Sequence, residues 1–138
     1  MPVSWTIGTS PTTELTNTML KKAVARFGNE ERRIIHSDRG SYYRWSEWIE
    51  ITKKAALTRS MSKKGCSLDN STCEGFFGRV KNEMFYDHDR QAVSLTEFKE
   101  ILNEYLNWYA HKRIQVSLGD LNPMEYRKLN GVQIDWQA

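Results

Sequence analysis

The sequence is poor in the residues that cross-link small extracellular domains. Its 138 residues include only two cysteines, Cys66 and Cys73, which cannot form a disulfide framework and lack the close paired spacing of a zinc site. No stretch approaches the ~20 apolar residues that span a bilayer, and no apolar segment of a signal peptide is present. We therefore exclude disulfide scaffolds and membrane spans, and expect a cytoplasmic protein in a reducing compartment with no membrane partner.

Several common catalytic arrangements are missing as well. The three histidines have no metal-ligand spacing, and neither a glycine-rich phosphate loop nor a Ser/His/Asp arrangement is present. His36 lies two residues before Asp38. It could orient that carboxylate, or it could be a histidine at the end of a strand with a local partner.

The charge of the chain is modest but unevenly distributed. The formal net charge is +3, whereas the stretch from Lys53 to Lys81 holds seven basic residues against Asp69 and Glu74, a local charge of +5. Such a positively charged stretch favours binding to a polyanion such as nucleic acid. A solvated basic surface is the alternative interpretation.

Hydrophobic periodicity predicts alternating strands and helices followed by helices alone. We expect strands at residues 3–7, 33–36 and, more weakly, 57–61. Helices are expected from Thr12 or Thr13 to Gly28, over residues 42–56, after the capping boxes Ser71/Glu74 and Ser94/Glu97, and from Pro123. The fold class is therefore α/β, with residues 1–138 as a single domain whose C-terminal third is helical.

Two carboxylates stand out by their positions. Asp38 follows an apolar strand, where ligands of open α/β sheets bind, and Glu74 lies in the first turn of an expected helix. Together they could hold a divalent cation. Alternatively, Asp38 is a turn residue and Glu74 only completes its capping box. Lys81, two helical turns after Glu74, could reach a phosphate or form a surface ion pair, and Asn70 could contact DNA or cap the helix.

Three groups of residues resemble motifs of insertion-sequence transposases of the integrase type. Residues 36–43 (HSDRGSYY) resemble the second-aspartate motif of these enzymes. Residues 60–70 (SMSKKGCSLDN), 74–77 (EGFF) and 81–83 (KNE) resemble their glutamate motif. Tyr109, Lys112, Arg113 and Leu118, followed by residues 122–126 (NPMEY), resemble their C-terminal signature.

The resemblance implies a fold, a reaction and a set of site residues. It implies a ribonuclease-H-like integrase catalytic core whose three acidic residues, Asp, Asp and Glu, bind Mg²⁺ or Mn²⁺. Such an enzyme cuts DNA at transposon ends and joins the 3′-hydroxyls to target DNA in the bacterial cytoplasm. Asp38 resembles the second aspartate and Glu74 the glutamate. The resemblance places Lys81 on the DNA and makes the loop containing Lys63, Lys64 and Asn70 a neighbour of the active site.

The chain departs from this pattern at its N-terminal end. The family's first catalytic aspartate lies on the first strand of the fold, but no Asp precedes Asp38 here. We therefore expect a C-terminal fragment of a transposase core, incomplete at its N-terminus, inactive alone and weak in metal binding. An unpaired strand at residues 3–7 would favour self-association, and a homo-oligomer is expected.

The resemblance leaves two alternatives to a transposase. One is a non-catalytic DNA-binding or assembly module of the same family, in which the carboxylates are structural. The other is a ribonuclease-H-like nuclease, which hydrolyses DNA without strand transfer. Metal titration distinguishes the first alternative from a transposase, and a strand-transfer assay distinguishes the second.

Overall fold

The computed structural model describes residues 1–27, 33–64, 67–86, 93–132 and 135. Its elements are α1 (Thr13–Arg26), β1 (Ile34–Ser37), α2 (Ser46–Lys54), β2 (Thr58–Met61), α3 (Ser71–Lys81), α4 (Leu95–His111) and α5 (Pro123–Leu129). Short 3-10 helices cover Ser41–Arg44, Ser67–Asn70 and Val116–Leu118, and a π-helical turn, Asn82–Tyr86, extends α3. No helix in these residues is long and apolar enough to cross a membrane.

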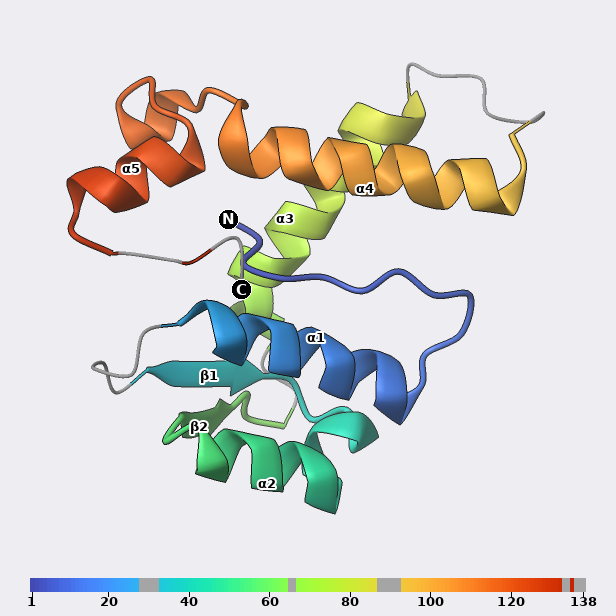
Figure 1. Cartoon of the computed structure of the whole chain (residues 1–138), viewed down its shortest axis with the longest axis vertical. Helices are drawn as coiled ribbons and strands as arrows, with labels where there is room; N and C mark the ends of the chain where they lie inside the picture. Colours follow the sequence, from blue (N-terminus) through green and yellow to red (C-terminus); the bar gives the residue numbers. More distant parts are fainter. Residues whose placement is uncertain (28–32, 65–66, 87–92, 133–134, 136–138) are drawn as a thin grey trace.

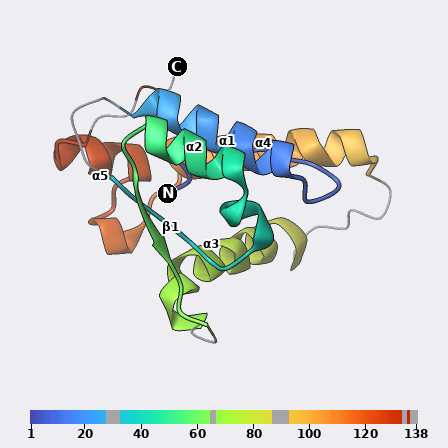
Figure 2. The ribbon, with the colours of Figure 1, turned by 90° about the horizontal axis from the view of Figure 1, so that it is seen from below.

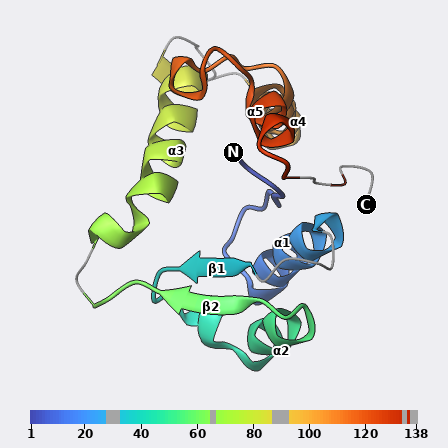
Figure 3. The same ribbon diagram turned by 90° about the vertical axis from the view of Figure 1, so that its left-hand side faces the viewer.

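A two-stranded parallel sheet lies in the N-terminal half of the molecule. β1 pairs with β2 in a register that sets His36 beside Ser60, and α2 forms the crossover between the strands. Helices α1 and α2 pack against each other next to this sheet (Figures 1 and 2). Both strands point toward the end of the molecule where α3 begins, and α3 connects that end to the layer of α4 and α5 (Figure 3). The predicted strands at 33–36 and 57–61 are confirmed to within one residue.

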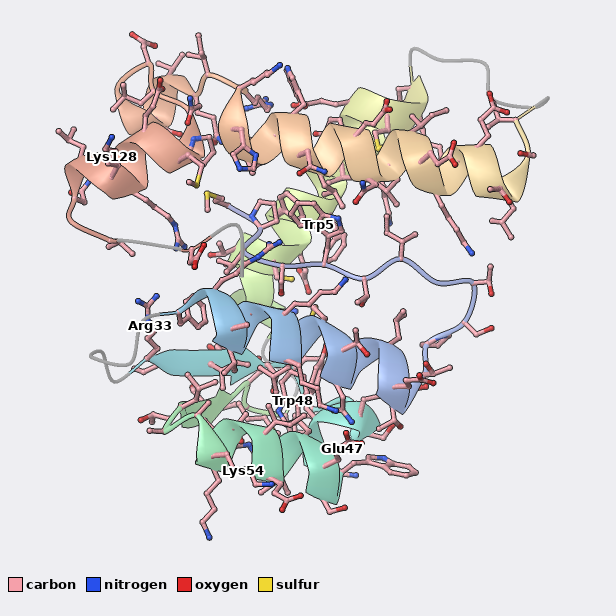
Figure 4. All side chains as sticks on the ribbon, viewed as in Figure 1. Trp5, Arg33, Glu47, Trp48, Lys54 and Lys128 are labelled. Carbon is pink, nitrogen blue, oxygen red and sulfur yellow. The ribbon has the colours of Figure 1, made fainter. Side chains whose placement is uncertain are left out.

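The predicted strand at residues 3–7 is wrong. The segment forms no strand, and no strand of the described residues pairs with it. Its alternating side chains bond to helices instead. Ser4 Oγ and Thr6 Oγ1 donate to the α1 carbonyls of Met19 (2.8 Å) and Leu15 (2.9 Å), and Trp5 Nε1 donates to Asn103 Oδ1 of α4 (2.8 Å). The segment therefore lies between α1 and α4, with the alternation of a strand but without a ladder (Figure 4).

The predicted helix over residues 42–56 is divided. A 3-10 turn, Ser41–Arg44, precedes α2, and the break falls at Trp45, whose backbone is extended (φ −73°, ψ 150°). Two contacts stabilise the break. Arg59 Nη2 donates to the Tyr43 carbonyl at 2.9 Å, and the Tyr43 ring packs edge-on against Trp48 with centroids 4.9 Å apart. Tertiary contacts thus override the helical pattern.

The ends of the other helices agree well with the sequence. Thr12 caps α1 by accepting from the Leu15 amide, and Ser94 caps α4 by accepting from the Glu97 amide. Asn122 and Glu125 form a complete capping box at α5. α1 ends with Phe27 as its C-cap, and the predicted stop, Gly28, lies outside the described residues.

The apolar stripe of α4 is only partly buried. Leu106, Tyr109 and Ala110 form part of the core, but Leu95 is 57% exposed and Trp108 is 44% exposed. The helical period therefore identified the buried positions Leu106 and Tyr109 correctly and overestimated burial at Leu95 and Trp108.

Candidate metal and DNA site

Asp38 directly follows β1, at the carboxyl end of the strand. Its Oδ1 atom accepts a hydrogen bond from the Gly40 amide at 2.8 Å. A Cβ atom at position 40 would come within 2.9 Å of that same oxygen, so glycine allows the turn to close on the carboxylate. Oδ2 has no hydrogen-bond or ion-pair partner in the described part of the chain. The turn therefore fixes the side chain and leaves one oxygen available to a ligand.

Glu74 occupies the first turn of α3, but the predicted capping box is wrong. The helix begins at Ser71 itself, so Asn70 is the N-cap residue, and the Asn70 side chain makes no capping hydrogen bond. The Glu74 carboxylate is exposed and has neither a hydrogen bond nor an ion pair within the described ranges. Its two oxygens are thus uncommitted, whereas a capping role would have occupied one of them.

The Cys73 thiol lies near both carboxylates. Burial, then the negative charges of Asp38 and Glu74, raise the pKa of this thiol. Burial and the Asp38 charge likewise raise the pKa of Tyr43. Like charges disfavour a thiolate only when they are close. The charge of Asp38, after β1, and the charge of Glu74, in the first turn of α3, therefore both act on the same thiol.

The donor set suits a hard divalent cation but is small. Carboxylate oxygens are ligands that Mg²⁺ and Mn²⁺ prefer. Within the described residues no group of three or more His, Cys, Asp or Glu side chains is arranged to hold a metal ion. An ion held by Asp38 and Glu74 would consequently keep most of its water.

The predicted DNA-contacting residues have uncommitted side chains. Lys63, Lys64 and Lys81 are exposed, and none of them, nor Asn70, has a side-chain hydrogen bond or ion pair within the described part of the chain. The Lys63 amide donates to Asp69 Oδ2 at 3.0 Å.

Other basic side chains of the same stretch are engaged elsewhere. Lys54 Nζ lies 3.3 Å from Glu50 Oε1, and Arg59 donates to the Tyr43 carbonyl. Of the seven basic residues of this stretch, Lys54 and Arg59 are therefore engaged with protein groups.

Comparison with known proteins decides the family. Two family models, each described as an integrase core domain, match residues 1–67 and 74–130, and together they cover most of the chain. The chain belongs to the integrase core domain family. The resemblance of the sequence motifs to this family is thereby confirmed.

Curated relatives of this integrase core are transposases or transposase-like proteins. The chain is 53% identical over 130 residues to the probable transposase for insertion sequence element IS1353 of Shigella flexneri, covering 94% of the chain and 25% of that protein. It is 35% identical to the putative transposase InsK of IS150 from Escherichia coli K12, covering 91% of the chain and 44% of InsK. A transposase-like protein of Haemophilus influenzae is also 35% identical and is covered to 56%. The chain thus spans about a quarter to just over half of these relatives.

The integrase core contains an ion pair that the sequence did not reveal. Arg113 binds the Glu83 carboxylate with two nitrogens, Nε at 3.0 and 3.1 Å and Nη2 at 2.5 Å, and Tyr105 Oη donates to the same carboxylate at 2.8 Å. Although burial opposes it, the hydrogen bonds from Arg113 and Tyr105 hold the pKa of Glu83 below its usual range. The Arg113 guanidinium also lies over the Tyr109 ring, 5.2 Å from its centroid.

This ion pair joins two of the motifs. Glu83 ends the KNE sequence and Arg113 belongs to the C-terminal signature, thirty positions away. The two motifs indicated that Glu83 and Arg113 matter, but no local sequence pattern shows that residues thirty positions apart form an ion pair. The Glu83–Arg113 pair connects the π-helical end of α3, the helix bearing Glu74 and Lys81, to the end of α4.

His36 contacts β2 and not Asp38. Its Nδ1 and Nε2 atoms each form a 3.0 Å hydrogen bond, with Ser60 Oγ and Ser62 Oγ respectively. Of the two roles left open by the sequence, the structure thus supports the strand-end histidine with a local partner.

Proposed function

We propose that this chain supplies part of the catalytic core of a DNA transposase with a ribonuclease-H-like fold, in which Asp38 and Glu74 hold Mg²⁺ or Mn²⁺. The whole enzyme would cut DNA at transposon ends and join the ends to target DNA. One observation carries the proposal: Asp38 at the carboxyl end of β1 and Glu74 in the first turn of α3 each have a carboxylate oxygen without a partner in the described residues. The family and the transposase relatives support the same function.

Each residue has a distinct role in this proposal. The bound ion would polarise the scissile phosphate and activate the attacking oxygen. Asp38, held by the Gly40 amide, and Glu74, in the first turn of α3, would fix the position of that ion. Lys63, Lys64 and Lys81 would neutralise backbone phosphates, and Asn70 would donate to a DNA oxygen.

We expect weak metal binding and no DNA cleavage by these 138 residues alone. Two carboxylates without a third leave the ion largely hydrated, so calorimetry should give a dissociation constant for Mn²⁺ on the order of millimolar. Asp38→Asn and Glu74→Gln should each abolish the binding signal, whereas Glu104→Gln on the exposed face of α4 should not. Micromolar binding, or nicking of a DNA duplex by the wild-type chain, would show that another ligand contributes.

Binding to duplex DNA should depend steeply on salt and little on sequence. Counterion release makes the logarithm of the binding constant fall by about 0.9 per phosphate contact for each unit of log salt. Replacing Lys63, Lys64 and Lys81 with Ala should reduce that slope by roughly 2 to 3, as measured by fluorescence anisotropy.

A control triple variant removes the same charge elsewhere. Lys21 and Lys54 are engaged with Glu47 and Glu50, and Lys128 lies on α5. Substituting these three with Ala should leave the slope nearly unchanged. Equal slopes for both triple variants would mean that the basic loop is only a solvated surface.

The same experiments separate the alternatives. Duplex binding without any response to Mn²⁺ would favour a non-catalytic DNA-binding module. In a polypeptide of the length of the relatives, cleavage without joining of 3′-hydroxyls would favour a nuclease.

Self-association belongs to the proposal as well. Residues 3–7 form no strand, but β1 and β2 each have one edge without a partner strand in the described residues. Such edges are templates for pairing with a second copy. Light scattering should detect a dimer at micromolar concentrations or above, and a strict monomer at those concentrations would oppose this part of the proposal.

A further inference from the structure

The His36 ring connects the ends of the two strands. In the parallel register His36 is level with Ser60, and Ser62 lies two residues further on, so the three side chains share one face of the sheet. One ring nitrogen bonds to each hydroxyl at 3.0 Å. The main chain reinforces the connection, because the Ser62 amide donates to the Ser37 carbonyl at 3.0 Å.

Both ends of this connection lead to the candidate site. Two residues after His36 the chain reaches Asp38, and directly after Ser62 it reaches Lys63 and Lys64. Ser62 is buried, although the lysines that follow it are exposed. The ring therefore links the two strands immediately before the carboxylate turn and the basic loop.

We propose that His36 is a positioning residue of the site, holding the start of the basic loop at a fixed place relative to Asp38 through the hydroxyls of Ser60 and Ser62. The inference rests on the proposed function for what the loop binds, but not for the contact itself. His36 does not touch the metal or the DNA in this proposal; it acts through β2.

Histidine suits this task because its two nitrogens point to different sides of one rigid ring. In the neutral ring one nitrogen donates and the other accepts, and a serine hydroxyl can take either role. The connection therefore needs no particular tautomer. Phenylalanine at position 36 keeps an aromatic ring but loses both hydrogen bonds. Glutamine has a side-chain amide that can form a hydrogen bond with one of the two hydroxyls.

Amide hydrogen exchange tests the contact directly. In His36→Phe we expect the amides of Ser62 and Lys63 to exchange about tenfold faster, and those of α1 and α4 to be unchanged. His36→Gln should fall between wild type and His36→Phe. The matched control is His111→Phe, since His111 Nδ1 bonds within α4 to the Asn107 carbonyl, and this variant should not affect Ser62.

Coupling to the serines gives a second test. Ser60→Ala with Ser62→Ala should accelerate the Lys63 amide in the wild-type background and add nothing in His36→Phe. If His36→Phe does not fold, the serine variants and His36→Gln provide the same comparison. Unchanged exchange at Ser62, or equal acceleration at all amides, would overturn the inference.

DNA affinity then tests positioning as opposed to local stability. His36→Phe should bind duplex DNA several-fold more weakly than wild type, and His36→Gln should recover part of the loss. Faster exchange with unchanged affinity would overturn the positioning role. A wild-type chain that binds no DNA would contradict the proposed function, while the exchange experiment would still decide whether His36 holds the loop.

Discussion

Replacing Arg113 with Ala should lower the free energy of unfolding by about 2–3 kcal/mol. Breaking a buried ion pair costs about 3–5 kcal/mol because the remaining charge stays desolvated, and here the two side chains are 20% and 29% exposed, which reduces the loss. Tyr105 would still donate to the orphaned Glu83 carboxylate. Urea unfolding followed by circular dichroism measures the change.

A substitution at the neighbouring residue and the pH dependence of the stability provide the controls. Lys112→Ala, at an exposed position beside Arg113, should change the stability by less than about 0.5 kcal/mol. Because the folded pKa of Glu83 is depressed, its contribution is present above the unfolded pKa of about 4.3 and is lost as the pH falls through the lower folded value. Arg113→Ala should therefore weaken the acid sensitivity. A loss equal to that of Lys112→Ala would mean that the pair does not hold α3 to α4.

Replacing Trp48 with Ala should destabilise the N-terminal half by about 3–5 kcal/mol. Trp48 is 2% exposed and packs edge-on against Tyr43, beside the turn that carries Asp38. The substitution leaves a large cavity under α2, and a domain of this size has only about 5–15 kcal/mol to lose. Thermal unfolding should show a melting temperature lower by more than about 10 °C.

Trp45 provides the matched control because it is the same residue type three positions earlier. It is 55% exposed, so Trp45→Ala should cost less than about 1 kcal/mol. Similar losses for both variants would contradict the packing described for α2.

Local signals predicted those elements whose ends are determined by nearby residues. The caps at Thr12, Ser94 and Asn122 act over three residues, and the helices they start appear as expected. The strand at 3–7 failed because alternation cannot reveal whether a partner strand exists. The helix over 42–56 failed because Arg59 and Trp48 hold Tyr43 in a 3-10 turn.

The contacts of the candidate site residues could not be predicted from the sequence. The motifs indicate Asp38 and Glu74 as candidates, whereas the Gly40 hydrogen bond to Asp38 and the unpaired state of the Glu74 carboxylate depend on how the turn at Gly40 and the start of α3 are built. The bonds from His36 to Ser60 and Ser62, and from Arg113 to Glu83, join residues 24 to 30 positions apart. Neither periodicity nor spacing carries that information.

The most direct test is a Mn²⁺ titration followed by nuclear magnetic resonance. If Asp38 and Glu74 hold one ion, the amides of Gly40 and Gly75 should broaden together at about millimolar Mn²⁺, and Asp38→Asn should abolish the broadening at Gly75 as well. Broadening at only one of the two amides, or broadening at Gly75 that survives Asp38→Asn, would contradict a shared metal site.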